Sequence, residues 1–222
     1  MGIHTHTELQ PSFAGPEETL HIIRSSINRL LNDLKFIVML GGEHSITIGA
    51  VQEFTQHFKD ITVLQLDAHT DLRNEYTGTQ YSHACVMRRV VELCPVVQVG
   101  IRSLSLEESA LVNTKGINTF FYKENSFDEL TRNEIINCLS DNVYISIDLD
   151  VFDPSIMSAV GTPEPGGMRW QEVIDLLRVV TEVKNVVGFD IVELCPPQGT
   201  DSCSYLAAKL AYKLIGYALI KG

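Results

Sequence analysis

The chain has 222 residues, of which 45% are hydrophobic, and its 17 Lys and Arg against 28 Asp and Glu give a net charge of −11. This length suits one globular domain, which we assign to residues 1–222. The hydrophobic content argues against disorder, and the acidic balance argues against a nucleic-acid-binding protein, which needs clustered Lys and Arg. Because no charge-free apolar run approaches the ~20 residues of a membrane span and no secretory signal begins the chain, we expect a cytoplasmic protein with no membrane contact.

The predicted elements alternate between helices and strands. A first helix is predicted at residues 16–33, where apolar residues recur at helical spacing and Pro16 with the two acids after it suits a first turn. It is followed in chain order by β-rich runs at residues 36–40, 61–66, 96–99 and 143–147, a helix at 170–183, a β-rich run at 186–191 and a last helix at about 202–220. The runs are nearly continuously apolar, as strands covered on both faces are. We therefore expect a largely parallel sheet with helices on both faces, which binds its ligands beyond the carboxyl ends of the strands.

Histidines or aspartates follow three of these strands. The first leads into GGEHS (residues 41–45), the second into DAHTD (67–71) and the fourth into DLDVFDP (148–154). An aspartate after a strand often caps the next helix, and a single histidine is usually an ordinary neutral side chain. Two pairs weaken that interpretation, Asp67 with His69 and Asp148 with Asp150, because residues two apart on an extended chain point to the same side.

Neighbouring strand ends would gather four carboxylates, those of Asp67, Asp71, Asp148 and Asp150. Without compensation these groups would repel one another and raise one another's pKa values. With His44 and His69 they suffice for two divalent cations that share bridging carboxylates. Such oxygen and imidazole ligands suit Mn²⁺, with Fe²⁺, Co²⁺ or Zn²⁺ as alternatives. Two metals ~3.5–4 Å apart can activate one water for hydrolysis at carbon or phosphorus.

At these residues the chain resembles the ureohydrolase family, the arginases and agmatinases. The segments DAHTDLR, YSHACVMRR, SIDLDVFDPS, GTPEPGG and DIVEL occur in the order of that family, and the resemblance extends from about Phe36 to the end of the chain. It implies a three-layer α/β sandwich with a mostly parallel central sheet, as in arginases and deacetylases. It also implies a homo-oligomer, a trimer or a hexamer.

The resemblance further implies two Mn²⁺ ions per subunit and their ligands. The more buried ion would be bound by His44, Asp67, Asp71 and Asp148. The second ion would be bound by Asp67, His69, Asp148 and Asp150, so that Asp67 and Asp148 bridge the two.

Three residues take catalytic roles by the same resemblance, in the hydrolysis of a guanidinium group to urea and an amine. Glu193 matches the glutamate that binds the guanidinium, since a carboxylate accepts the paired hydrogen bonds of a planar NH₂ pair. His83 matches the proton-shuttle histidine, whose pKa near neutrality suits proton exchange with solvent. Asp71 is expected to relay a proton to the departing nitrogen.

The substrate is expected to be agmatine, with putrescine and urea as products in polyamine biosynthesis. Arginine-specific members carry asparagine and serine residues after the DAHxD motif, whereas residues 72–83 here resemble the agmatinase version. Glu164, in GTPEPGG, is at a position where agmatinases have a glutamate. An acid at the pocket mouth, Glu164 or Glu75, would suit the second cationic end of agmatine and disfavour a carboxylate.

Several alternatives stay open from the sequence. The chain could be an arginase or a guanidinobutyrase-type ureohydrolase. A deacetylase-like hydrolase normally lacks the second-metal set to which His44, Asp71 and Asp150 belong. An inactive relative would bind polyamine or only assemble. Because only 40 residues precede Gly41, fewer than is usual in the family, we expect either a longer natural protein or a short variant whose exposed sheet edge is covered by oligomerisation.

Overall fold

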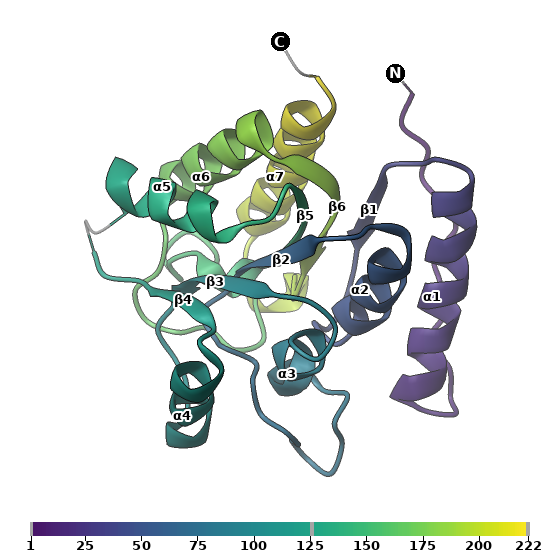
Figure 1. Ribbon diagram of the computed structural model, residues 1–222, viewed down its shortest axis with the longest axis horizontal. Coiled ribbons are helices and arrows are strands. Elements are labelled where there is room, and N and C mark those ends of the chain that lie inside the picture. The colour runs from purple at the N-terminus through teal and green to yellow at the C-terminus, as the bar shows by residue number, and fades with distance from the viewer. Residues whose placement is uncertain (1, 125–126, 221–222) are drawn as a thin grey trace.

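A computed structural model describes residues 2–124 and 127–220, which form one six-stranded sheet with helices on both faces (Figure 1). The strand order is β1-β6-β5-β2-β3-β4, and every neighbouring pair is parallel. This arrangement confirms the predicted α/β sandwich with a parallel central sheet.

The strands are β1 (Ile37–Leu40), β2 (Ile61–Leu66), β3 (Val96–Ile101), β4 (Asn118–Phe121), β5 (Asn142–Asp148) and β6 (Asn185–Val192). The helices are α1 (Pro16–Asn32), α2 (Ile46–His57), α3 (Val86–Val90), α4 (Leu106–Lys115), α5 (Glu129–Cys138), α6 (Trp170–Val183) and α7 (Asp201–Leu219). None of these described helices has both the length and the apolar content that crossing a membrane requires.

Two hydrophobic clusters cover the two faces of the sheet. One cluster contains buried residues of α5, α6 and α7, and the other contains buried residues of α1, α2 and α3. Figure 1 shows these two groups of helices on opposite sides of the strands. The strands β2 and β3 are buried along their whole length, which explains their continuous apolar sequences.

Five strands and three helices lie where the sequence predicts them, but β4 was not predicted. This strand is short, NTFF, and its residues are partly or fully exposed at one edge of the sheet. It therefore lacks the apolar run that marks the central strands. At the opposite edge lies β1, which ends at Leu40 with 69% of that residue exposed.

Packing between β6 and α2 gives a first test of the fold. A Cβ atom at Gly188 would lie 2.6 Å from the ring of Phe54 and 3.2 Å from the carbonyl oxygen of Ile37. We expect Gly188→Ala to lower the free energy of unfolding by about 1–3 kcal/mol, because a methyl group overpacks this contact.

A second glycine provides the matched control in urea unfolding. Gly216 lies inside α7, and apart from the backbone of the helix itself and the two adjacent residues, no atom of the described residues lies within 4 Å of a Cβ built there. Gly216→Ala should raise the free energy of unfolding by about 0.5–1 kcal/mol, since alanine favours the helix. Equal midpoints for the two variants would contradict this account of the β6–α2 packing.

Candidate active site

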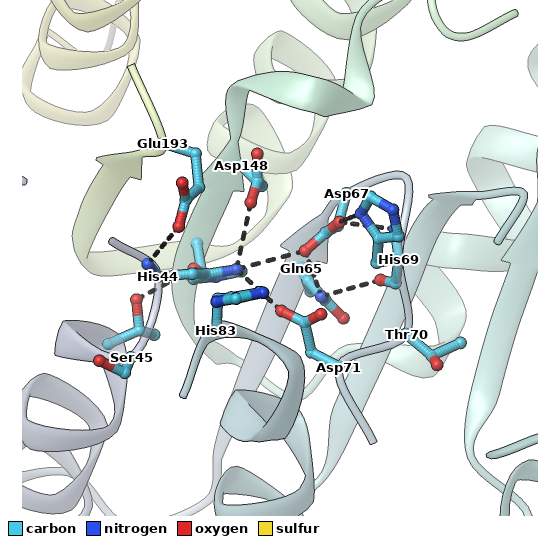
Figure 2. Close-up of polar contacts among 12 residues, drawn as sticks. His44, Ser45, Gln65, Asp67, His69, Thr70, Asp71, His83, Asp148 and Glu193 are labelled. Carbon is cyan, nitrogen blue, oxygen red and sulfur yellow. Dashed lines mark hydrogen bonds and ion pairs between the residues drawn. The ribbon is translucent and has the colours of Figure 1, made fainter. Parts of the chain in front are cut away.

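The candidate site lies at the carboxyl edge of the sheet, where four neighbouring strands end. His44 follows β1, Glu193 follows β6, Asp148 closes β5 and Asp67 follows β2, and these strands are adjacent in the order β1-β6-β5-β2. Figure 2 shows the four side chains converging from their separate strand ends. The parallel topology thus brings together residues that are up to 149 positions apart in the sequence.

The first group of ligands surrounds one nitrogen atom of His44. Its Nδ1 lies 3.0 Å from Asp71 Oδ2, 3.3 Å from Asp67 Oδ2 and 3.4 Å from Asp148 Oδ2. The His44 side chain is fully buried, and Nδ1 has no well-oriented hydrogen bond to any described residue. A buried imidazole nitrogen that faces three carboxylates in this way fits a divalent cation between them.

The second group of candidate ligands consists of Asp67, His69 and Asp150. His69 Nδ1 lies 2.9 Å from Asp150 Oδ2 and 3.6 Å from Asp67 Oδ1, and the possible ligand atoms of the three residues lie within 4.8 Å of one another. Asp67 therefore turns one oxygen toward each group, which is the arrangement of a bridging carboxylate. Asp148 is in the first group, and its other oxygen accepts a hydrogen bond from the Asp150 amide at 2.9 Å. Its expected bridging role stays a prediction.

Burial sets the protonation of this cluster when no cation is bound. Burial and the neighbouring charge of Asp67 raise the pKa of Asp71 to about 7, and burial with the charges of Asp150 and Asp67 holds the pKa of Asp148 well above its usual value. Burial would lower the pKa of His69, but hydrogen bonds to Asp150 and Asp67 raise it to about 11. Without cations, bound protons thus lower the net negative charge of the cluster. Divalent cations would replace these protons when they bind.

Polar side chains inside the strands hold the ligands in place. Gln65 donates a hydrogen bond to Asp67 Oδ2 at 2.7 Å, and His44 Nε2 lies 3.0 Å from the Ser146 hydroxyl (Figure 2 shows the first contact). The buried carboxylate of Asp190 accepts three hydrogen bonds, from Thr47, Tyr144 and Ser146. Asp190 thus supports the site from one step further away, because Ser146 lies between it and His44.

Gln65 and Ser146 were missed by the sequence analysis, although a signal for them exists. Each is a polar residue inside an otherwise apolar run, ITVLQLD for Gln65 and VYISIDLD for Ser146, close to the end that carries ligands. A buried polar side chain needs a partner, so such positions next to a cluster of acids indicate residues that orient it.

Two site residues have left-handed backbone conformations that are rare outside glycine. Asp71 has φ of +52° and Glu193 has φ of +65°. The Glu193 amide donates to the Gly42 carbonyl at 2.8 Å, and one Glu193 carboxylate oxygen accepts from the His44 amide at 2.6 Å. Because such a conformation costs about 1–3 kcal/mol, the surrounding contacts must hold it, as functional sites often do.

His83 lies at the start of the short helix η1 (His83–Cys85), with 41% of its side chain exposed. Its Nδ1 is 3.3 Å from Glu43 Oε1, and the hydrogen bond to this carboxylate raises the pKa of His83. The edge of its ring packs against Tyr76 at a centroid distance of 5.4 Å. A histidine that is open to solvent and lies close enough to Asp71 to feel its charge suits proton exchange.

The two acids expected at the mouth differ in position. Glu164 Oε1 lies 3.9 Å from His69 Nε2, at the border of the second ligand group, and 36% of its side chain is exposed. Glu75 is exposed in the loop before His83, and among the described residues no hydrogen bond or ion pair joins it to the two ligand groups. The geometry favours Glu164 over Glu75 as a residue of the site.

Arg102 ties the loop of Glu164 to the turn of Asp150, and the sequence analysis did not identify it. It follows β3, and its guanidinium Nη2 donates to the carbonyl oxygen of Asp150 at 2.7 Å and to that of Glu164 at 3.1 Å. Its Nη1 lies 3.3 Å from the Val151 carbonyl. One side chain therefore fixes two loops that carry functional residues.

Comparison with known proteins shows the family of the chain. The model of the arginase family matches residues 1–216. The N(1)-aminopropylagmatine ureohydrolase of Synechocystis sp. is 39% identical over 225 residues, which cover 98% of this chain and 73% of the relative. The enzyme of the same name from Thermus thermophilus is 42% identical over 97% of this chain and 74% of its own length. The crystal structure of the agmatine ureohydrolase of Thermoplasma volcanium superimposes with a TM-score of 0.84 at 36% identity, over 95% of this chain and 71% of that one.

The fold and the paired ligand groups therefore define a metal-dependent hydrolase of the arginase type. The chain belongs to the arginase family, as the five motifs predicted. Within that family its relatives include ureohydrolases of agmatine and of N(1)-aminopropylagmatine.

Removal and return of metal test the ligand cluster. Added Mn²⁺ should raise the melting temperature of the metal-free protein, because a ligand that binds only the folded state adds about 2.7 kcal/mol at a hundred times its Kd. Asp148→Ala should lose most of this shift, since it removes one of the carboxylates around His44.

Asp153→Asn is the control for this measurement. Asp153 belongs to the same motif but lies outside both ligand groups, and asparagine can still accept the hydrogen bond from the Ser155 amide. We expect this variant to keep the full shift. An equal loss in both variants would show that net charge rather than ligation is responsible.

Proposed function

We propose that this chain is a binuclear-manganese ureohydrolase that cleaves agmatine to putrescine and urea. The observation that carries the proposal is the Asp67 carboxylate, which joins two groups of ligands beside Glu193 at one edge of the sheet. Family membership supports the same reaction, because the relatives described above act on agmatine or on its N(1)-aminopropyl derivative, as their names state.

The two ions are assigned to the residues that the sequence predicted. One would be held by His44, Asp67, Asp71 and Asp148, and the other by Asp67, His69, Asp148 and Asp150. Imidazole mixed with carboxylate suits Mn²⁺ better than Mg²⁺, which prefers oxygen alone. When bound, the two ions neutralise the carboxylates and supply a water of lowered pKa as the nucleophile.

Glu193 is positioned to receive the guanidinium group. One of its oxygens is held by the His44 amide, and the other lies 3.7 Å from the place that a side chain at Gly161 would fill. The absence of a side chain at Gly161 thus leaves room in front of a carboxylate that the main chain orients. Burial raises the pKa of Glu193, so a planar cation with paired NH₂ groups would compensate a costly buried charge.

Proton transfer to the departing amine is assigned to Asp71 and His83. Asp71 lies within the first ligand group and would pass a proton to the nitrogen that leaves. His83 would transfer protons between the site and solvent, because its ring is partly exposed and paired with Glu43. Glu43 orients the ring from the GGEHS loop, which also carries His44.

Glu164 would select substrates that have a second positive charge. Agmatine ends in an ammonium group, whereas arginine and 4-guanidinobutyrate carry a carboxylate that Glu164 would repel. The N(1)-aminopropyl derivative also ends in an ammonium group, so the two substrates named for the relatives are both cationic at the tail.

Assembly and location complete the proposal. The edge strand β1 exposes backbone groups that a second subunit would cover, which supports a homo-oligomer, a trimer or a hexamer. We place the protein in the cytoplasm with small guanidino compounds as its partners. The presence of both ligand groups, with His44 and Asp71 in the first, argues against a one-zinc deacetylase-like hydrolase. The full set of ligands with His83 and Glu193 argues against an inactive relative.

Urea release tests the substrate. Purified protein loaded with Mn²⁺ should release urea faster from agmatine than from arginine or 4-guanidinobutyrate, and a chelator should stop all three reactions. A faster rate with either carboxylate-bearing compound would overturn the assignment to agmatine. Urea release that is unaffected by the chelator would overturn the metal mechanism.

The role of Glu164 has its own test in the Michaelis constant. Glu164→Gln should raise KM for agmatine about two- to fivefold at unchanged kcat, since a partly exposed ion pair contributes about 0.5–1 kcal/mol. Glu75→Gln removes an equal charge from the loop before His83 and should leave KM as it is. The same KM in both variants would exclude Glu164 from the substrate-binding role.

A further inference from the structure

One carboxylate outside the ligand groups holds the loop that carries Asp71. Glu108 lies in the first turn of α4, with 5% of its surface exposed, and it was not singled out by any motif. Its Oε1 accepts a hydrogen bond from the Thr70 hydroxyl at 2.9 Å and another from the Leu72 amide at 3.1 Å. A single oxygen atom therefore bonds to both chain neighbours of Asp71.

Asp71 needs such support because of its backbone. Its φ of +52° is one that residues with side chains adopt rarely, and the chain must be held from both sides to keep it. On the other side, the Arg88 amide donates to the Asp71 carbonyl oxygen at 3.0 Å. The conformation aims Asp71 Oδ2 at His44 Nδ1, 3.0 Å away, as Figure 2 shows.

We propose that Glu108 is a positioning residue that fixes Asp71 in the first metal site through Thr70 and Leu72. This inference rests on the proposed function, because it takes Asp71 as a ligand of one ion. Asp71 contacts His44 and belongs to the first ligand group, whereas the second group consists of Asp67, His69 and Asp150. Loosening Asp71 should therefore weaken one of two bound ions and leave the other unchanged.

Glu108 has a second task, which the experiment must separate from the first. Its Oε2 accepts from the Ser105 amide at 2.7 Å, and its own amide donates to the Ser105 hydroxyl at 3.3 Å, so the two residues cap α4 reciprocally. Ser105→Ala removes the second of these bonds and keeps the contacts of Glu108 with Thr70 and Leu72. It therefore measures the cost of a weaker cap alone.

Two variants test the positioning role directly. Glu108→Ala removes both acceptor oxygens, so the bonds from Thr70, Leu72 and the Ser105 amide are all lost. Thr70→Val keeps the shape of the side chain and removes only its donor to Glu108, which guards against a failure of the first variant to fold. Glu107→Gln, one residue earlier in the same helix, controls for the lost charge.

The first readout is titration of the metal-free proteins with Mn²⁺ alone. We expect Glu108→Ala to weaken one of the two binding events by about 10–100-fold, the usual effect of losing a group that orients a ligand, and to leave the second unchanged. Thr70→Val should weaken the same event to a smaller degree. Glu107→Gln and Ser105→Ala should bind both ions as the wild type does.

The second readout needs no metal. In the metal-free protein, hydrogen exchange of the segment 70–73 should be faster in Glu108→Ala than in Ser105→Ala, because the Leu72 amide loses its acceptor only in the former. Unchanged exchange, equal weakening of both ions, or equal effects of Ser105→Ala and Glu108→Ala would each overturn the proposal. A wild type that binds no Mn²⁺ would refute the proposed function. Faster hydrogen exchange of the segment 70–73 in the Glu108 variant would still show that Glu108 holds the loop of Asp71.

Discussion

The approach of three buried carboxylates to one imidazole nitrogen is the constraint that arranges the carboxyl edge of this sheet. Asp67, Asp71 and Asp148 lie 3.0–3.4 Å from His44 Nδ1, in a place where water does not screen their mutual repulsion. An apolar core would exclude such groups. The parallel strands bring these carboxylates to His44, with Asp67 and Asp71 coming from the end of β2 and Asp148 from the end of β5. This combination of side chains suits a divalent cation that would neutralise them.

Around that cluster, buried polar groups orient the candidate ligands. Gln65 and Ser146 point from the strands toward Asp67 and His44, and Asp190 anchors Ser146 in turn. The strained conformation of Asp71 is held by hydrogen bonds to its neighbours and to its own carbonyl oxygen. The orientation of the candidate ligands is thus decided by residues outside the two ligand groups, because a carboxylate without such partners rotates freely.

The ligands themselves could be predicted from the sequence, because they follow apolar runs in recognisable motifs. Once parallel strands are accepted, residues just after β1, β2, β5 and β6 must meet at one edge, and the described site contains all of them. Glu108 and Arg102 could not be found in this way. Both lie after β3, which contributes no ligand, and their importance depends on tertiary contacts with carbonyl oxygens and amides that leave no pattern in the residues nearby. The edge strand β4 could not be predicted either, because it is short and its partly exposed residues form no apolar run that would distinguish it from a loop.

The shared guanidinium of Arg102 has a consequence for how this scaffold can change over evolutionary time. Its Nη2 donates to the main chain of both Asp150 and Glu164, so the turn that carries a candidate metal ligand and the loop proposed to contact the substrate tail depend on the same donor. Insertions or deletions that reshape the loop would also displace the support of the turn. New substrate preferences are therefore more accessible through side-chain replacements on a loop of fixed length than through remodelling of its backbone.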